Sequence, residues 1–540
     1  MTNNNNKWQP FIYGMLIAAG ILIGMWLRPS AGAKISIGAS SKFGEMLSII
    51  KEAYVDSVNI QDLENKTLNE MLSNLDPHST YIPAEELQKA NEPLEGNFDG
   101  IGVEFNIVND TIMVVSAIIG GPSQELGIKA GDRIIRVDTM PVAGVKITND
   151  HVIKLLRGKR GTDVNVTIYR PYEKQKLDFK ITRNTIPIYS VDASFMIDSE
   201  TGYIKISRFA ATTHDEFLKA FAELETQDIK NLILDLRGNP GGYLNAATEL
   251  ADEILEGKKL IVYTQGRTKP KQEFFTEHTG AFETGKLVVL IDEGSASASE
   301  ILSGSIQDWD RGLVVGRRSF GKGLVQEPFD LSDGSALRLT VSRYYTPSGR
   351  CIQKDYKTNG YDEYENDIYA RIENGELEDA SKQKIYDSTE YRTKLNSRIV
   401  YGGGGIYPDV FVPIDTSYNT RFLSEVFANG LLNKFAYDYL DKNRSSIMAI
   451  SDLNVYSKSY QISDVAFNLF IAFCKQENIG SLNAPDVNRS KNFIKLQLKA
   501  LVARQIWREK GYYNVVSKQD KGVLTAIEAL AKYNQLMNKK

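Results

Sequence analysis

After Ile181, apolar strands alternate with amphipathic helices along the chain. Strand-like runs at residues 231–236 (NLILDL), 259–264 (KLIVYT) and 286–291 (KLVVLI) are separated by stretches with helical periodicity. Such an order is typical of α/β layers, because neighbouring parallel strands need a crossover connection and a helix usually provides it. The sequence therefore predicts an α/β core with largely parallel strands in the middle of the chain.

The regions on either side of this core follow other patterns. Residues 39–90 show helical periodicity, whereas residues 96–170 carry short β-rich runs broken by Gly and Pro. Residues 355–400 are polar and charged, which indicates a surface insertion or a partly ordered loop. The residues after 416 are mostly helical in period. We expect five parts: 1–35, 36–89, 90–173, 174–415 and 416–540.

Composition excludes several functions. The 540 residues include 64 Lys and Arg against 68 Asp and Glu, a net charge of -4 without a basic block, so nucleic acid is not an expected partner. Two cysteines, Cys351 and Cys474, allow at most one disulfide bond. The histidines stand at no metal-ligand spacing, so we expect neither a metal nor another cofactor. They are His78, His151, His214 and His278.

The N-terminus contains an uncharged apolar run, Phe11 to Leu27. Its 17 residues would span roughly 25 Å as a helix, slightly less than a hydrocarbon core of about 30 Å. The run is either a signal anchor or a signal peptide, since the small residues at 31–33 resemble a cleavage site. We favour the anchor because the run exceeds a typical signal-peptide core and Trp26 suits a membrane interface.

Three alternating serines, Ser295, Ser297 and Ser299, lie between the strand at 286–291 and a predicted helix. A hydroxyl at such a turn is exposed beside the positive end of the helix dipole, which suits a nucleophile. The letters at 297–300 also fit a capping box, in which Ser297 and Glu300 merely satisfy backbone donors. The pattern alone decides neither between these interpretations nor between the three serines.

A second glycine turn carries a candidate base. Lys322 lies in GRRSFGKGLVQ, residues 316–326, directly after another apolar strand. Because an amine between buried strands is poorly hydrated, its pKa should fall, and a neutral amine can take the proton of a serine hydroxyl. Gln326, four residues further along a predicted strand, faces the same side as Lys322 and could orient the amine by a hydrogen bond.

Acyl transfer also requires N–H donors for the oxyanion. The turn at residues 237–242 (RGNPGG) exposes backbone amides at the end of a parallel strand, where α/β sites usually form, although it is also simply a tight turn. With a nucleophile nearby, we expect Gly241 or Gly242 to supply one donor and Ala298 the other.

Two competing interpretations of these residues are weaker. Gly316 to Lys322 satisfies the phosphate-loop pattern, but Gly323 stands where Ser or Thr would bind magnesium, and a strand rather than a helix follows. A Ser-His-Asp arrangement could use His214 and Asp215, yet polar residues at a helix start explain that pair. An NTPase and a histidine-dependent hydrolase are therefore both disfavoured.

Six motifs, in order, resemble those of the carboxyl-terminal processing peptidases, also called tail-specific proteases. They are LDPHSTY at 75–81, GIGVEF at 100–105, LDLRGNPGG at 234–242, GSASASEI at 294–301, SFGKGLVQ at 319–326 and GGIYPDV at 404–410. The resemblance covers roughly residues 40–415. It implies that Ser297 is the nucleophile, Lys322 the base and Gln326 a supporting residue.

The resemblance also implies an α/β fold with a crotonase/ClpP-like spiral core, an inserted mainly-β PDZ domain, a helical N-terminal segment and a helical C-terminal extension. The turn formed by Gly100, Ile101, Gly102 and Val103 would then bind a peptide carboxylate, and the strand that follows would accept the peptide as an added strand. Whether the PDZ domain activates the enzyme or only tethers a substrate stays open.

Together these features predict a serine endopeptidase that cleaves cell-envelope proteins near their C-termini. Expected partners are polypeptides with accessible C-terminal tails, the membrane through residues 11–27, and a second copy or an adaptor. The expected location is the bacterial cell envelope, with an inner-membrane anchor and a periplasmic catalytic part, or secretion into the periplasm after signal cleavage. The alternative to an enzyme is an inactive scaffold whose PDZ domain only binds C-terminal tails.

Overall fold

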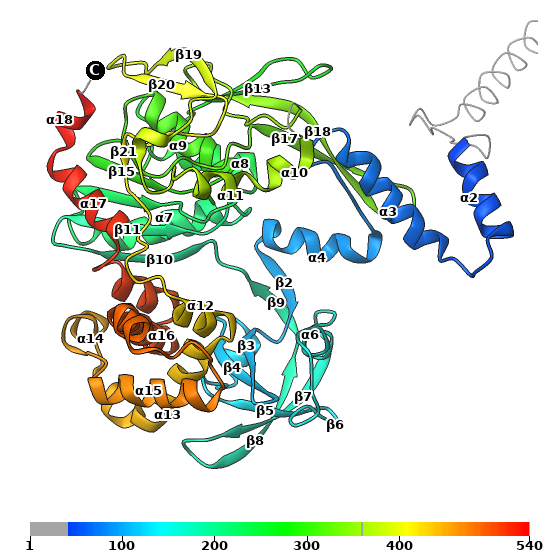
Figure 1. Ribbon diagram of the computed structural model, residues 1–540, viewed down its shortest axis with the longest axis vertical. Helices are drawn as coiled ribbons and strands as arrows, with labels where there is room; N and C mark the ends of the chain where they lie inside the picture. The colour runs from blue at the N-terminus through cyan, green and yellow to red at the C-terminus, as the bar shows by residue number, and fades with distance from the viewer. Residues whose placement is uncertain (1–41, 358–359, 539–540) are drawn as a thin grey trace, which may run out of the picture. The chain divides into compact units, whose positions relative to one another are not determined.

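The computed structural model describes residues 42–357 and 360–538 (Figure 1). The chain divides into two compact units, residues 1–70 and 71–540. The first unit holds α2 (Lys42–Ala53) and most of α3 (Ile60–Ser73). No residue of α2 is buried.

The apolar segment at 11–27 lies outside the described residues. Within 42–357 and 360–538, no helix combines the length and the hydropathy that crossing a bilayer requires. Even the 33-residue helix α16 (Ala484–Val516) contains charged side chains, which are costly in hydrocarbon. This finding goes against the predicted transmembrane helix and the predicted inner-membrane location, and both predictions are withdrawn.

The predicted PDZ domain is an antiparallel sheet with strand order β3-β4-β5-β7-β8 and the short β6 paired to β5. Alternate residues of each strand point into one core that also includes Val152 and Leu156 of its helix α6, as expected for a half-buried sheet. Strand β8 continues this sheet to Thr182, beyond the predicted boundary at 173. The elements are β3 (Val103–Val108), β4 (Thr111–Ala117), α5 (Pro122–Glu125), β5 (Arg133–Val137), β6 (Met140–Pro141), α6 (Asn149–Leu156), β7 (Asp163–Arg170) and β8 (Gln175–Thr182).

A two-stranded ribbon connects the PDZ domain to the rest of the chain on both sides. Strand β2 (Asn97–Gly100) enters the domain and pairs antiparallel with β9 (Asn184–Pro187), which leaves it. Helix α4 (Ala84–Glu95) precedes this ribbon and ends at Gly96, which has a left-handed φ of 75°. The PDZ domain is thus an insertion within the chain of the peptidase core.

The predicted peptidase core is built on a six-stranded sheet with order β10-β11-β12-β15-β16-β21. Strands β11 to β21 along this order are parallel, and only the edge strand β10 runs antiparallel. Strand β15 is apolar along nearly its whole length, as expected for a parallel sheet that is covered on both faces. The strands are β10 (Val191–Met196), β11 (Thr201–Ile206), β12 (Asn231–Asp235), β15 (Lys286–Ile291), β16 (Leu313–Gly316) and β21 (Val410–Phe411).

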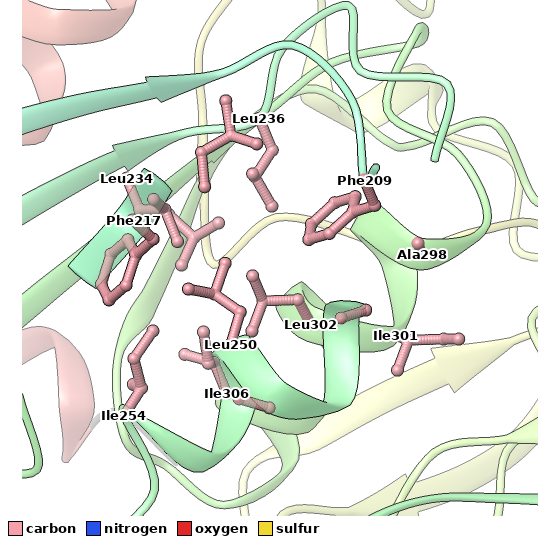
Figure 2. Packing of buried hydrophobic residues seen from close by; sticks show 14 of the residues in the cluster. Phe209, Phe217, Leu234, Leu236, Leu250, Ile254, Ala298, Ile301, Leu302 and Ile306 are labelled. Carbon is pink, nitrogen blue, oxygen red and sulfur yellow. The ribbon is translucent and has the colours of Figure 1, made fainter. Parts of the chain in front are cut away.

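Helices cover both faces of this sheet. On one face, α7 (Thr213–Glu225), α8 (Leu244–Asp252) and α9 (Ala298–Asp308) form the main hydrophobic core (Figure 2). Figure 2 shows Leu302 and Ile306 of α9 beside Leu250 of α8, with Ala298 at the start of α9 in the same cluster. The predicted α/β layering is therefore present, and the first residue of α9 is anchored in the core.

A second sheet has the order β1-β18-β13-β14, with β17 also paired to β18. It joins segments that are far apart in the sequence, because β1 pairs with β18 through Thr80 and Arg338. The strands are β1 (Thr80–Ile82), β13 (Leu260–Gln265), β14 (Gln272–Phe275), β17 (Leu324–Asp330) and β18 (Ala336–Tyr345). This sheet brings the LDPHSTY segment next to the strands that follow Lys322.

The described part of the charged stretch at 355–400 is largely structured, so of the two predicted alternatives the partly ordered loop does not hold. Its charges pair inside the protein, because Glu376 forms ion pairs with Arg318 at 2.7 Å and with Arg371 at 3.1 Å, and all three residues are buried. A charge pattern in sequence does not reveal such inward pairing. The elements are α10 (Gly360–Glu365), α11 (Asp367–Glu373), the 3₁₀ helix η1 (Ala380–Lys382), β19 (Asp387–Arg392) and β20 (Ile399–Gly402).

The C-terminal extension is helical, as expected. Most of its helices share one apolar cluster of their own, whereas α17 packs against the second face of the peptidase sheet through Val523, Ala526 and Leu530. The helices are α12 (Arg421–Ala428), α13 (Leu431–Met448), α14 (Leu453–Ser459), α15 (Asp464–Gln476), α16 (Ala484–Val516), α17 (Lys521–Ala531) and α18 (Tyr533–Met537).

Candidate active site

Of the three alternating serines, only Ser297 has a partly exposed side chain. Ser295 and Ser299 are fully buried, and their hydroxyls donate hydrogen bonds of 2.9 Å to the carbonyl oxygens of Leu236 and Asn239. Ser297 caps α9 with a φ of 54° and a ψ of -112°, a strained conformation for a residue with a side chain. Burial therefore leaves Ser297 as the one accessible hydroxyl in this segment.

The carboxylate of Glu300 is fully buried and accepts four hydrogen bonds. Its Oε2 accepts from the main-chain N–H groups of Ser297 at 2.8 Å and Lys322 at 2.9 Å. Its Oε1 accepts from the Ser319 hydroxyl at 2.5 Å and the Gly321 N–H at 2.7 Å. One carboxylate thus joins the serine turn to the lysine turn. The sequence pattern at 297–300 identifies Glu300 only as part of a capping box.

This carboxylate fixes the separation of the two turns. Because the amide nitrogens of Ser297 and Lys322 contact the same oxygen, they lie no farther apart than the sum of those two distances. The buried hydroxyl of Tyr344 in β18 adds a second link, since it contacts the carbonyl oxygens of Ser297 at 3.1 Å and Lys322 at 2.5 Å. The main chains at positions 297 and 322 are therefore held side by side from two directions.

Burial raises the pKa of Glu300 to about 7, whereas the hydrogen bonds from Ser319, Lys322, Gly321 and Ser297 lower it. All four partners are donors, and only the ionised carboxylate accepts from all of them without losing an acceptor site to its own proton. The link between the two turns is therefore complete when Glu300 is charged.

Lys322 has the electrostatic character expected of a base. Burial lowers the pKa of its amine below the usual lysine value, the charge of Arg338 acts in the same direction, and Glu300 and Asp76 oppose the shift. Within the described part of the chain, no hydrogen bond or ion pair engages this amine, and none joins it to the Ser297 hydroxyl. Catalytic hydrogen bonds are often long in ligand-free enzymes and tighten when substrate binds.

Gln326 lies in β17, as predicted, but it makes no hydrogen bond to the Lys322 amine. Its Nε2 is instead a buried atom without a partner among the residues that the structure describes. A buried N–H group of this kind is costly to leave unpaired. The predicted supporting contact is therefore not formed in this conformation.

His78 and Asp76 also belong to the surroundings of Lys322, although sequence reasoning missed both. Burial lowers the pKa of His78 to about 3, and the charge of Lys322 is the next largest cause. The His78 ring contacts the Tyr364 hydroxyl at 2.7 Å, and Asp76 accepts from the His78 main-chain N–H at 2.9 Å. Their position in the LDPHSTY motif was the available signal, but only the pairing of β1 with β18 brings that motif to the site.

Gly241 packs directly against the serine turn. A Cβ atom at this position would lie 2.8 Å from both the Ala296 carbonyl oxygen and the Ser297 Cβ, and 3.0 Å from the Ala298 nitrogen. Its φ of 99° also favours glycine. The Gly241 N–H donates to the side-chain oxygen of Asn239 at 2.9 Å, so this amide already has an acceptor.

Gly242 is the better placed of the two predicted glycine donors. Phe209 donates to the Gly241 carbonyl at 2.9 Å and accepts from the Tyr243 N–H at 2.8 Å, so the Gly242 amide between them points away from Phe209. No hydrogen bond from the N–H of Gly242 or of Ala298 is present among the described residues. Ala298 begins α9, where main-chain N–H groups lack partners within the helix.

The competing histidine mechanism gains no support from the geometry. His214 contacts Glu253 at 2.7 Å rather than Ser297, and Asp215 lies in the first turn of α7. Polar residues at a helix start account for both positions, as the sequence had indicated.

The loop expected to bind a peptide carboxylate lies between β2 and β3. Gly100 ends β2, Ile101 is buried in the PDZ core, Gly102 has a left-handed φ of 75°, and Val103 begins β3. Strand β3 stands at the end of the PDZ strand order and pairs only with β4 within the described chain. One edge of β3 is therefore without a strand neighbour.

Models of three known families match this chain. Residues 200–362 match peptidase family S41, and residues 100–181 match the PDZ domain. Residues 422–508, within the C-terminal extension, match a family of unknown function (DUF8443). The α/β core that matches family S41, with an accessible serine at a helix start and an inserted PDZ domain, defines a serine-type peptidase with a peptide-binding module.

Two curated relatives resemble the chain over more than half its length. It is 34% identical over 348 residues to the carboxy-terminal-processing protease of Bartonella bacilliformis, and this match covers 64% of this chain and 79% of that protein. It is 35% identical over 321 residues to the carboxy-terminal processing protease CtpB of Bacillus subtilis, and this match covers 58% of this chain and 66% of that protein. The chain belongs to the carboxy-terminal-processing proteases of peptidase family S41.

Among solved structures, a photosystem II D1 C-terminal processing protease is 28% identical, with a TM-score of 0.33, and the match covers 58% of this chain and 89% of that one. The family assignment confirms the predicted fold class, the resemblance to the family and the serine-type peptidase activity. The domain boundaries and the roles of single site residues stay predictions.

Proposed function

We propose that Ser297 is the nucleophile of this peptidase and that Lys322 is its general base. The neutral Lys322 amine takes the hydroxyl proton while Ser297 Oγ attacks a peptide carbonyl carbon. The protonated amine then returns a proton to the leaving amine, and water hydrolyses the resulting acyl-enzyme. The observation that carries this proposal is the single Glu300 oxygen that contacts the main chains of both residues, beside the one accessible serine of the segment.

The proposed oxyanion donors are the N–H groups of Gly242 and Ala298. Two N–H groups aimed at one point stabilise a tetrahedral oxyanion far better than they stabilise the planar carbonyl. Gly241 contributes space rather than a donor, because its own N–H already bonds to Asn239. Of the two predicted glycine donors, Gly241 and Gly242, we therefore propose Gly242.

Gln326 is the proposed partner of Lys322 in the substrate-bound state. Its buried and unpaired amide N–H would gain an acceptor if a rotation of the side chain engaged the substrate or the neutral amine. In that arrangement the amide oxygen would accept from the Lys322 amine while the amide nitrogen donates elsewhere.

The proposed substrates are extended polypeptides with accessible C-terminal tails, with cell-envelope proteins as the source. The PDZ domain supports a peptide substrate, and the unpaired edge of β3 supports binding of the tail as an added strand. The carboxylate would lie at the loop formed by residues 100–103. Binding of a second copy or an adaptor stays a prediction.

The test of this mechanism uses an unfolded protein with a free C-terminal tail as the substrate. Replacing Ser297 with Ala should lower the cleavage rate roughly 10⁴-fold or more, because covalent catalysis is lost. Ser305→Ala, the same change in the same helix, removes a hydroxyl that among the described residues bonds only to the Leu302 carbonyl, and the rate should stay within a few-fold of wild type. Unchanged cleavage by Ser297→Ala would reject the nucleophile.

The same assay separates the peptidase from an inactive scaffold. A scaffold would bind a tail peptide, measured by fluorescence anisotropy, without releasing any new N-terminus. Tail binding by wild type together with no cleavage after prolonged incubation would favour the scaffold.

A further inference from the structure

The C-terminal helical region, residues 431–520, contacts the outer face of the PDZ strand β3 in the same chain. The Glu104 carboxylate accepts from the Arg504 guanidinium of α16 at 2.7 Å. The Asn106 amide donates to the Tyr437 hydroxyl of α13 at 3.1 Å. Positions 104 and 106 lie on one face of the strand, because side chains alternate along it. Two helices thus hold one face of β3.

Apolar and charged contacts extend this interface. Tyr437 is buried in a small cluster with Val108 of β3 and with Met113 and Val115 of β4. On the same helix, Asp441 lies 3.7 Å from the guanidinium of Arg133 in β5. The helical region therefore packs against the PDZ sheet itself and does not merely touch a loop.

This interface leaves the peptide-accepting edge of β3 uncovered by a strand. Val103, Phe105 and Ile107 point to the opposite face, where they pack against the PDZ core. Peptides add to a strand through its main-chain edge. A tail bound to β3 would therefore meet a strand whose other face is attached to α13 and α16.

The other end of the helical region reaches the turn that precedes the proposed oxyanion donor. The Asp520 carboxylate caps α17 by accepting from the Val523 N–H at 2.9 Å, and it accepts from the Arg237 guanidinium at 2.8 Å and 3.1 Å. Arg237 also bonds to the buried Asp235 and stands directly before residues 238–242. The same region of the chain thus contacts both the PDZ strand and the oxyanion turn.

A strained residue lies between these two contacts. Helix α16 is broken at Arg508, whose φ of 58° and ψ of -150° are unusual for a residue with a side chain. Arg504 and Glu509 form an ion pair at 2.5 Å across the break. Arg504 therefore links the PDZ strand to the helix segment that follows the break and continues toward Asp520.

We propose that the C-terminal helical region, residues 431–520, couples binding of a peptide tail on β3 to the conformation of the oxyanion turn. The inference rests on the proposed function, because it concerns the same active site. It gives a role to a region that matches a family of unknown function. The ion pair between Glu104 and Arg504 is the connection at the PDZ end, and the pair between Arg237 and Asp520 is the connection at the active site.

The test compares two forms of one substrate peptide, one with a free C-terminal carboxylate and one with an amidated C-terminus. The measured ratio is the rate at which the full chain cleaves the peptide with the free carboxylate, divided by the rate at which it cleaves the amidated peptide. This ratio reports the coupling. Arg504→Glu should lower this ratio about fivefold or more, because it places like charges at β3 and breaks the pair with Glu509. Cleavage of the amidated peptide should change little.

Two further variants make the result specific. The exchange of charges at all three positions, Glu104→Arg with Arg504→Glu and Glu509→Arg, restores opposite charges in both ion pairs and should bring the ratio back to within about twofold of wild type. Lys510→Glu, on the same helix, makes the same charge change at an exposed residue that pairs with no described residue, and it should leave the ratio unchanged. An unchanged ratio in Arg504→Glu, or no recovery in the exchange variant, would overturn the proposal.

Hydrogen exchange separates failure of this inference from failure of the proposed function. A saturating amount of free tail peptide should slow amide exchange in residues 237–242 of Ser297→Ala, a variant that needs no catalysis to be measured. Arg504→Glu should abolish that slowing while the peptide still slows exchange in β3. Slowing at 237–242 that persists in Arg504→Glu would exclude the coupling, whatever the outcome of the cleavage assays.

Discussion

The turns of the active site and the C-terminal helices contribute to this enzyme in different ways. The turns at 237–242, 294–300 and 316–323 carry the proposed reactive groups, and each is recognisable from its Gly, Ser or Lys pattern. The helices from α12 to α18 carry no recognisable catalytic pattern, yet α17 covers one face of the peptidase sheet and α13 and α16 hold the PDZ domain. Reactive chemistry is local in this chain, whereas the placement of its parts depends on packing over long sequence distances.

This comparison predicts two kinds of variant. A change in a turn should lower the rate and leave the free energy of unfolding nearly intact, because few buried apolar contacts are lost. A change on the buried face of a C-terminal helix should lower the free energy of unfolding and leave the rate per folded molecule nearly intact. The predictions below test this division, beginning with the largest effect.

Lys322→Met should lower the cleavage rate by roughly 10³-fold, because it removes the general base and keeps the length and volume of the side chain. The melting temperature should not fall, since the variant removes a partly buried amine that has no hydrogen-bond partner in the described chain. Lys176→Met, at an exposed position of β8, controls for loss of a positive charge. A large drop in melting temperature would contradict the division between turns and helices.

The wild-type rate should rise with pH, because only the neutral Lys322 amine accepts a proton. Burial lowers the pKa of this amine, so the rise should level off below the ordinary lysine value of 10.5. A pH–rate profile that is flat or falls from pH 6 to pH 9 would contradict Lys322 as the base.

Gly241→Ala should lower kcat by about 10²-fold, an effect of the size seen when an oxyanion donor is displaced. The added Cβ would lie 2.8 Å from the Ser297 Cβ and 2.8 Å from the Ala296 carbonyl oxygen, so the two turns must separate. Gly238→Ala in the same turn is a control for a positive φ, here 66°, because no atom lies within 4 Å of the added Cβ. Equal losses in the two variants would show that backbone strain alone is responsible.

Leu530→Ala should lower the free energy of unfolding by about 2–4 kcal/mol, because this side chain is buried between α17 and the peptidase sheet. Leu524→Ala on the same helix should cost less than about 0.5 kcal/mol, since that side chain is 42% exposed. Denaturant unfolding measures both changes. A loss of rate per folded molecule in Leu530→Ala that exceeds the loss in Gly241→Ala would erase the difference between the two regions.

Between pH 7 and pH 5 the free energy of unfolding should fall by about 1 kcal/mol less in His78→Gln than in wild type. This value is discounted because the ring is partly exposed to solvent. In the folded protein the pKa of His78 is lowered from 6.5 to about 3, so the unfolded chain binds a proton at a higher pH than the folded chain. The stability contribution is complete above pH 6.5 and is lost as the pH falls toward 3. Thermal unfolding across this range should show a shallower slope for His78→Gln than for wild type.

Several site residues could be predicted from the sequence because their chemistry is local. The serine turn, the lysine turn and the glycine turn each follow an apolar strand, and parallel strands bring their ends to one edge of a sheet. Ser297 could not be separated from Ser295 and Ser299 by local pattern, because burial and hydrogen bonding in the fold distinguish them. The resemblance to the family had supplied that choice.

The contributions of other residues depended on contacts that no local pattern contains. Glu300 fitted a capping box, but its four hydrogen bonds to two turns require β16 and α9 to be side by side. His78 looked isolated because the partner strand of β1 lies much later in the chain. The prediction of a membrane anchor rested on residues 11–27 alone. It is contradicted by the finding that no described helix is long and apolar enough to cross a bilayer.

The strand–helix order, the turn chemistry and the class of reaction could be predicted without a structure, because they depend on residues within a few positions of one another. The folded chain was needed to learn which serine is accessible, which carboxylate joins the two turns, and which helices hold the PDZ strand. Each of these depends on burial and on distances between segments far apart in the chain. The physical reason is that solvation and hydrogen bonding act through space, and local sequence records only the nearest neighbours along the chain.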